Sequence, residues 1–189
     1  MMGSNSNLAC FEGILIGNRI PHEFFVTTGF GESDIAIHAG SYHLALKKAK
    51  IESYNIICYS SILPKIAQKI SRPDNMVHGS VMETIMAVGH TNKGKLGSAG
   101  IVYGWLYDKE TNEKFGGLVC ESSGQVTEDD ISQELNASLQ ELYTNGFSEK
   151  YDLRDKEVIT SSFAPSKKHG TVLVALCFTN YIIPIIKNE

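Results

Sequence analysis

Strand-like runs far outnumber helical patterns in this chain, and this imbalance constrains its fold more than any other feature. Runs rich in Val, Ile, Thr and aromatic residues are typical of strands. They cover residues 55–59, 80–91, 98–107, 114–121, 157–163 and 171–179. The polar stretch 108–113 lies between two of these runs and predicts the loop of a β-hairpin. Strands joined in this way pair antiparallel, so we expect a mostly antiparallel sheet.

Two segments have helical periodicity instead. The first carries small and apolar residues at helical spacing, with Ser41 available as its cap: Tyr42, Ala45, Leu46 and Ala49. The second has a stripe formed by Ile131, Leu135, Leu139 and Leu142. Thr127 can cap this helix and Asn145-Gly146 can end it. Helices separated by groups of strands favour an α+β fold, a layered sandwich of mostly antiparallel sheet covered by helices.

The two ends of the chain are less regular. Residues 13–28 predict two short strands, because Gly17-Asn18 and Pro21 interrupt an otherwise strand-like run. The glycine-rich segment 29–34 predicts a loop. The apolar tail 182–186 is interpreted as a last strand or a plug on the core, with a contact to another subunit as the alternative.

Length and composition favour one cytoplasmic domain covering residues 1–189. A net charge of −4 and the lack of a basic block argue against a nucleic-acid partner. The start of the chain lacks the pattern of a secretory signal, and no apolar stretch is long enough to span a bilayer. The four cysteines are scattered and the histidines lack ligand spacing, so we expect reduced thiols and no metal site.

The pair Ser60-Ser61 lies between the apolar run 55–59 and Leu63-Pro64. Taken alone, two serines at this place predict only a turn. The whole segment 49–64, AKIESYNIICYSSILP, resembles the self-cleavage region of pyruvoyl-dependent arginine decarboxylases. In that family a helix ending in Ala-Lys-Ile-Glu leads through Asn and an apolar strand to Ser/Thr-Ser-Ile/Val-Leu/Met-Pro.

Other segments resemble the same family in the same order along the chain. Residues 78–87, HGSVMETIMA, are similar to the strand after the cleavage site. Residues 116–121, GGLVCE, are similar to the strand that presents the catalytic glutamate, and 29–34 to an early glycine-rich loop. The glycine-rich loop would be weak evidence by itself, whereas the Ser-Ser segment is specific.

The resemblance implies that the chain processes itself. The Ser61 hydroxyl would attack the Ser60 carbonyl, and elimination and hydrolysis would turn Ser61 into a pyruvoyl group. Cleavage would give a β chain of residues 1–60 and an α chain of residues 61–189. The pyruvoyl carbonyl would take up the substrate amine and withdraw electrons as carbon dioxide leaves, so no external cofactor is needed.

Roles for individual residues are also implied by the resemblance. Glu121 matches the acid that protonates the decarboxylated product, and apolar neighbours such as Val119 and Cys120 would keep it protonated. Asn55 matches a residue that holds the cleavage turn and the pyruvoyl group. The alternatives are a solvated carboxylate at a strand end and a simple turn asparagine. The expected substrate contacts are Asp34, Glu52, Tyr54 and Ile62.

One position departs from the family. An arginine pocket needs a carboxylate for the guanidinium, and the aspartate of family members falls on His43 of this chain. Either another carboxylate replaces it, with Asp34 the first candidate before Glu32 and Glu52, or the substrate is not arginine. His43 could also be an ordinary residue of the helix surface.

We therefore expect a decarboxylase that converts arginine to agmatine and carbon dioxide, for polyamine supply or acid tolerance. The alternatives are a pyruvoyl decarboxylase for another amino acid and an unprocessed homologue that serves as a binding or structural subunit. Family members assemble as trimers or pairs of trimers, with sites between neighbouring subunits. By resemblance, we expect a homo-oligomer here, with the apolar tail as interface material.

Overall fold

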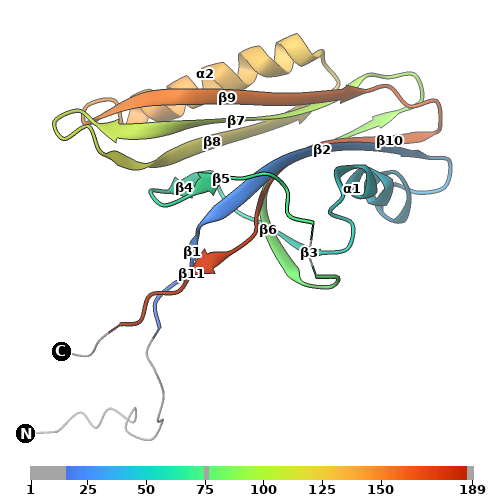
Figure 1. Ribbon diagram of the computed structural model, residues 1–189. Helices are drawn as coiled ribbons and strands as arrows, with labels where there is room; N and C mark the ends of the chain where they lie inside the picture. Colours follow the sequence, from blue (N-terminus) through green and yellow to red (C-terminus); the bar gives the residue numbers. More distant parts are fainter. Residues whose placement is uncertain (1–15, 75–76, 187–189) are drawn as a thin grey trace, which may run out of the picture.

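The computed structural model describes residues 16–74 and 77–186 (Figure 1). Eleven strands, two α-helices and one short π-helix follow one another in these ranges. In chain order they are β1 (Ile20–Pro21), β2 (Glu23–Ser33), η1 (Ile37–Tyr42), α1 (His43–Ala49), β3 (Asn55–Cys58), β4 (Ile62–Pro64), β5 (Gln68–Lys69), β6 (Val81–Asn92), β7 (Gly97–Asp108), β8 (Lys114–Gly124), α2 (Glu128–Gly146), β9 (Tyr151–Phe163), β10 (His169–Phe178) and β11 (Tyr181–Ile182). The predicted α+β class with mostly antiparallel pairing is confirmed.

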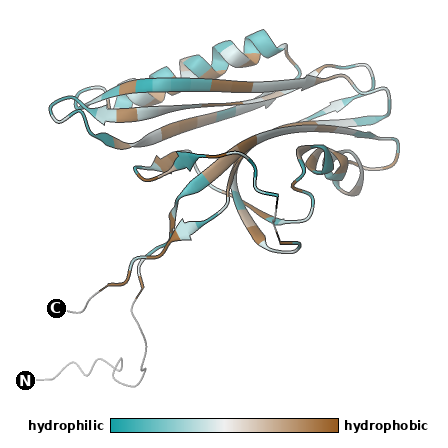
Figure 2. Cartoon of the chain, in the orientation of Figure 1, coloured by the Kyte–Doolittle hydropathy of each residue, from teal (hydrophilic) through white to brown (hydrophobic). Residues whose placement is uncertain are grey.

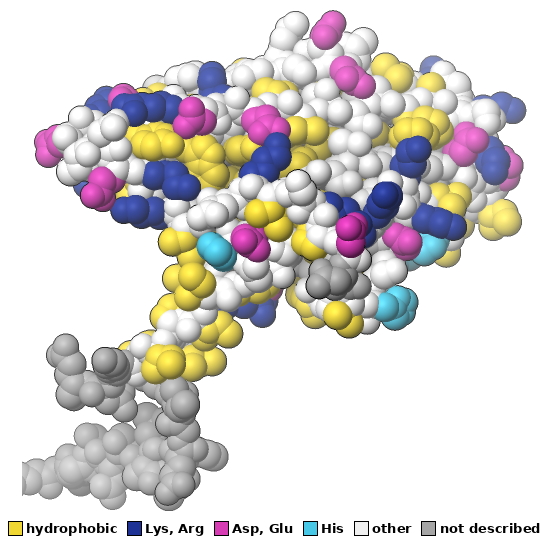
Figure 3. Space-filling model, viewed as in Figure 1, with side chains coloured by type: hydrophobic (Ala, Val, Ile, Leu, Met, Phe, Trp, Pro, Cys, Tyr) yellow, Lys and Arg dark blue, Asp and Glu magenta, His cyan; other side chains and the backbone are white. Residues whose placement is uncertain are grey.

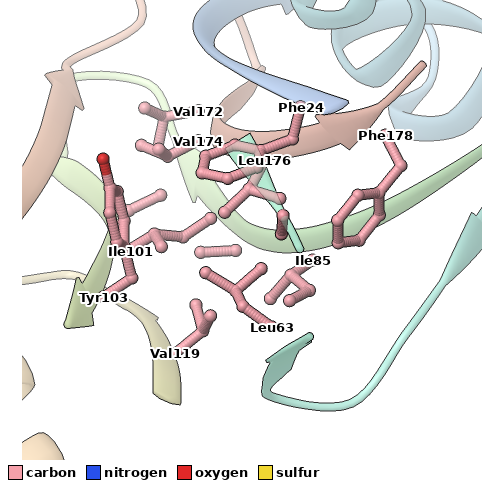
Figure 4. Close-up of a cluster of buried hydrophobic side chains, with 13 residues drawn as sticks. Phe24, Leu63, Ile85, Ile101, Tyr103, Val119, Val172, Val174, Leu176 and Phe178 are labelled. Atoms are coloured by element: carbon pink, nitrogen blue, oxygen red, sulfur yellow. The ribbon is translucent and has the colours of Figure 1, made fainter. Parts of the chain in front are cut away.

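Two sheets face each other across a buried apolar core. The five-stranded sheet has the order β3-β6-β10-β2-β5 and the four-stranded sheet the order β4-β8-β7-β9. Most neighbours in them are antiparallel, and β3 on β6 and β2 on β5 are parallel. The core between the sheets takes Phe24 and Ile85 from the first sheet and Leu63 and Val119 from the second. Figure 4 shows side chains from both sheets converging there.

Each sheet carries a helix on its other face. Helix α1 packs on the five-stranded sheet through Ala45, Leu46 and Ala49, and α2 packs on the four-stranded sheet through its predicted stripe. Thr127 caps α2 as expected, because its hydroxyl accepts the Asp130 N–H at 3.2 Å. Figure 2 shows most of α2 as hydrophilic. Strand β10, covered on both faces, is almost wholly buried, which explains its continuous apolar sequence.

Two predictions about the first helix and its surroundings were wrong. The glycine-rich segment 29–34 is not a loop, because strand β2 continues through it to Ser33. Its glycines let the helix approach the strand closely: a Cβ on Gly31 would lie 2.5 Å from the Ser41 carbonyl oxygen. Ser41 is not a cap either, since it lies fully buried inside η1 and α1 begins without a side-chain cap.

The predicted hairpin is confirmed, with β7 and β8 joined across residues 109–113. Strand β9 starts at Tyr151, six residues before the predicted start at Glu157. The apolar tail forms a last strand, because β11 pairs with β1 and Ile185 bridges to Ile16. This terminal ribbon, residues 16–21 and 181–186, projects from the body, and Figure 3 shows it as largely hydrophobic.

Some predictions fall on residues 1–15, among them Cys10 and the start of the first predicted strand, and these lie outside the described ranges. Within the described ranges, no helix combines the length and the apolar character that crossing a membrane requires.

Candidate active site

The bond between Ser60 and Ser61 lies where the chain passes from one sheet to the other. Strand β3 is an edge of the five-stranded sheet, and its pairing continues through Tyr59, whose N–H donates to Thr84 O at 2.7 Å. Strand β4 is an edge of the four-stranded sheet, and Val119 N–H donates to Ser61 O at 3.0 Å. Hydrogen bonds to two different sheets therefore fix both sides of the serine pair.

The crossover is a tight turn. Ile62 N–H donates to the Ser60 carbonyl at 2.9 Å, two residues back, which closes a three-residue turn centred on Ser61. The carbonyl that would be attacked thus already accepts one hydrogen bond, which polarises it.

Ser61 and Glu121 lie next to each other where the chain enters the four-stranded sheet. The β4–β8 register places Ser61 opposite Val119, and Glu121 follows two residues later on the same face of β8. Ser61 Oγ donates to Glu121 Oε2 at 3.3 Å. Burial raises the pKa of the neighbouring Cys120 thiol, with a further contribution from the Glu121 charge. Glu121 itself is exposed, so the described part of its own chain does not supply the apolar surroundings expected for it.

Asn55 lies at the opposite end of β3. Its Nδ2 donates to Gly79 O and its backbone N–H to Ser80 O, both at 2.9 Å. At roughly 3.3 Å per residue, the run from Asn55 to Tyr59 spans about 13 Å. Asn55 therefore orders the loop before β6, and the structure does not bring it to Ser61 of the same chain.

A groove of about 560 Å³ opens beside Asn55, between β3 and the helices. Its size suits a small-molecule ligand. It is lined by His38, Ala39, Tyr42, His43, Leu46, Tyr54, Asn55 and Ile56. Burial raises the pKa values of Tyr42 and Tyr54, so both phenols remain neutral donors at ordinary pH. The rings of His38 and Tyr42 stack with centroids 5.8 Å apart.

The carboxylates proposed for a guanidinium lie elsewhere. Asp34 Oδ1 accepts Lys168 N–H at 3.1 Å, and Glu32 accepts Ser166 N–H at 2.6 Å, in the turn that leads into β10. The hydrogen bond from the Ser166 backbone also holds the pKa of Glu32 below its usual value. Glu52 is half-buried in the link between α1 and β3, two residues before Tyr54.

The other expected substrate contacts divide between two places. Tyr54 lines the groove with Asn55, whereas Ile62 follows Ser61 on β4 and is 55% exposed. One chain thus presents a reactive turn of Ser60, Ser61, Ile62 and Glu121, and separately a groove.

Sequence reasoning missed two groove residues. The sequence places Tyr42 in the apolar pattern of the first helix, and His38 lies before that pattern as one of the histidines without ligand spacing. The π-helical turn η1 places both in the groove. Two aromatic residues, Tyr42 and His43, lie four and five positions after His38, and this spacing was the signal available in the sequence.

Known proteins are similar to this chain over most of its length. A model of the family described as pyruvoyl-dependent arginine decarboxylase (PvlArgDC) matches residues 23–182. The pyruvoyl-dependent arginine decarboxylase AaxB of Chlamydia caviae is 31% identical over 193 residues, which cover 87% of this chain and 94% of that protein. AaxB of Chlamydia trachomatis serovar L2 is 31% identical with the same coverage of each chain. Pyruvoyl-dependent arginine decarboxylase 2 of Methanosarcina mazei is 34% identical over 77 residues, 39% of this chain and 41% of the relative.

The predicted family is therefore confirmed, together with its enzyme class, the carboxy-lyases, and its covalently bound pyruvoyl group. With most of its length matched, this chain belongs to the pyruvoyl-dependent arginine decarboxylase family.

Proposed function

We propose that this chain cleaves itself between Ser60 and Ser61 and then decarboxylates arginine to agmatine and carbon dioxide. The hydrogen bond of 3.3 Å between Ser61 Oγ and Glu121 Oε2 carries this proposal. It joins the hydroxyl that would become the nucleophile to a carboxylate that can take its proton. The residue that would become the pyruvoyl group also already lies beside a proton carrier.

The first step is an exchange of one bond for another at the Ser60 carbonyl. Ser61 Oγ bonds to the carbonyl carbon, the peptide C–N bond breaks and the nitrogen of Ser61 becomes a free amine. Glu121 accepts the hydroxyl proton and returns it to the departing Ser61 nitrogen, and Ile62 N–H stabilises the charge that develops on the Ser60 oxygen. An ester now links the two serines.

Elimination then opens the ester. A proton leaves Ser61 Cα, its Cβ–Oγ bond breaks and Ser60 departs as a carboxylate. Hydrolysis consumes one water, releases ammonia and leaves a pyruvoyl group at the start of the α chain. The resulting fragments are residues 1–60 and 61–189.

Both fragments would remain in place after cleavage. Strand β3 of the β chain stays paired with β6, and β4 of the α chain stays paired with β8. Strand β2, also in the β chain, is paired with β10 over ten residue pairs. Cleavage therefore frees the two ends of the turn without removing an inner strand from either sheet.

The pyruvoyl group supplies an electron-withdrawing carbonyl beside the carbon that loses carbon dioxide. Glu121 would return a proton to that carbon, since it lies next to position 61. Groove residues would orient the far end of the substrate, with Asn55 offering its carboxamide and Tyr54 its phenol. The groove and the reactive turn have to meet for this to happen.

A second copy of the chain would bring them together. Asn55 lies about 13 Å along β3 from Tyr59, which is too far to contact a substrate held at Ser61 of its own chain. Apolar side chains near the edge strands are exposed in the single chain: Ile57 at 46%, Ile62 at 55% and Val81 at 55%. The terminal ribbon adds exposed Ile182 and Ile185. We propose a homo-oligomer, a trimer or a pair of trimers, with sites between subunits.

Ser61→Ala should abolish cleavage, because alanine has no hydroxyl to attack the Ser60 carbonyl. Ser60→Ala keeps the backbone carbonyl and should still cleave. Denaturing gel electrophoresis of the purified proteins separates the intact chain from the two fragments. Cleavage of Ser61→Ala at the same bond would contradict the proposal. A wild-type chain that never cleaves would favour the unprocessed binding subunit.

The shared site can be tested by combining two inactive chains. Asn55→Ala should lose at least about 100-fold in kcat because it removes a group that orients the substrate. Glu121→Gln should lose at least as much, because it removes the group that takes the Ser61 proton in self-cleavage and returns a proton to the product. Co-expressed with distinguishable tags, they should regain up to about a quarter of wild-type activity, since random assembly pairs an intact groove with an intact turn at that frequency.

Controls for this experiment come from the same pair of residues. A double variant carrying both changes in one chain, co-expressed with either single variant, should stay inactive. Recovery of activity by the double variant, or none by the two single variants, would contradict a site shared between subunits.

The groove also favours a second candidate function, decarboxylation of a different amino acid. It has two imidazoles, those of His38 and His43, and no carboxylate among its described lining residues. Among these lining residues a guanidinium would find hydrogen-bond acceptors and aromatic faces but no opposite charge.

The amino-acid preference of the wild type, together with His43→Asp, separates the two candidates. With arginine as the natural substrate, the new carboxylate should lower the KM for arginine about tenfold by pairing with the guanidinium. His22→Asp adds the same charge outside the groove and should leave the KM unchanged. Carbon dioxide release is measured over a panel of amino acids. A wild type that prefers another amino acid to arginine would establish the second candidate.

A further inference from the structure

We infer that Ser41, Thr171 and His90 are positioning residues that hold η1 in its π-helical form, so that His38 and His43 face the same substrate groove. This inference rests on the proposed function, which makes the groove the binding place for the far end of the substrate. None of the three residues lines the groove itself, as its described lining shows. They would affect substrate binding only by keeping η1 in its π-helical form.

The π-helical turn decides which side chains reach the groove. Ser41 N–H donates to Ala36 O, five residues back, at 3.1 Å. In an α-helix each residue turns by about 100°, so residues five apart lie about 140° apart around the axis. Bonding over five residues turns the backbone less per residue and brings such positions closer to the same side of the axis. His38 and His43 therefore both line the groove, with Tyr42 stacked on His38.

A buried chain of hydroxyl groups fastens this turn to the sheet. Ser41 and Thr171 are both fully buried, and their hydroxyl oxygens lie 2.8 Å apart. Thr171 Oγ1 lies 3.0 Å from His90 Nδ1 of the neighbouring strand β6. Ser41 Oγ donates onward to the Ile37 carbonyl at 3.5 Å. Since each hydroxyl donates once, the chain runs from His90 Nδ1–H through Thr171 and Ser41 to η1.

The hydrogen bonds among His90, Thr171 and Ser41 contribute to the stability of the π-helical form of η1. π-helical turns are rare compared with α-helical ones, so a π-turn needs support from contacts outside its own segment. Gly31 allows η1 to lie against β2, which excludes water from Ser41 and Thr171. A buried hydroxyl without its partner is unfavourable. The satisfied chain therefore stabilises the π-form, and breaking it should let the turn relax and carry His43 away from the groove.

Thr171→Val tests this with a side chain of nearly the same shape and no hydroxyl. We expect the KM for the preferred amino acid to rise about tenfold, kcat to change less than about twofold and self-cleavage to stay complete. Thr171→Ser restores the hydroxyl and should restore the KM. Thr91→Val is the matched control, because Thr91 is 4% exposed and its hydroxyl bonds to Lys95 O away from η1.

Hydrogen exchange of the peptide covering residues 36–43 gives a second readout that needs no activity. Thr171→Val should speed this exchange at least about fivefold relative to both the wild type and Thr91→Val. An unchanged KM, or a rise matched by Thr91→Val or not reversed by Thr171→Ser, would overturn the inference. If the wild type decarboxylates nothing, the proposed function fails, and exchange alone then decides: unchanged protection in Thr171→Val overturns the inference.

Discussion

The hydrogen-bond ladders of β3 on β6 and of β4 on β8 are the constraint on which the proposed chemistry depends. They anchor the chain in two different sheets on either side of Ser60 and Ser61. The residues between have no freedom to straighten, so the chain closes a tight turn there. The Ser61 hydroxyl is held at a carboxylate, and the Ser60 carbonyl is held at a backbone donor. A serine pair in an ordinary surface loop would lack these fixed partners.

The same two-sheet arrangement keeps the reactive turn apart from the groove, and the proposed site therefore needs two chains. The reactive turn lies where the chain leaves the five-stranded sheet, and the groove lies at the far end of β3 under α1. Strand length alone keeps the two apart. Assembly of identical chains can join the turn of one to the groove of another, and the exposed apolar residues near both edge strands are suited to such a contact.

Much of the fold could be predicted from the sequence, because hydrophobic periodicity and capping residues act locally. The stripe of α2 and its Thr127 cap are examples. The continuation of β2 through Gly29 and Gly31 could not be predicted, because those glycines serve a helix packed from elsewhere in the chain. Serine is a residue type that often caps helices, but Ser41 lies inside η1, where its hydroxyl hydrogen-bonds to Thr171, far away in the sequence.

Some residues of the site could be predicted from the sequence and others could not. Ser60, Ser61 and Glu121 were named from the resemblance, and the structure places Ser61 against Glu121. Asn55 was expected to hold the cleavage turn, and within one chain it lies at the other end of its strand from that turn. His38 and Tyr42 were missed, since a π-helical turn depends on tertiary contacts that periodicity does not encode.

The intact mass of the purified wild-type protein under denaturing conditions tests self-processing most directly. The account predicts two chains, residues 1–60 and 61–189, with the larger chain lighter than the simple hydrolysis product by the mass difference between an amino-terminal serine and a pyruvoyl group. A single chain of full mass, or an α chain that still begins with serine, would contradict it.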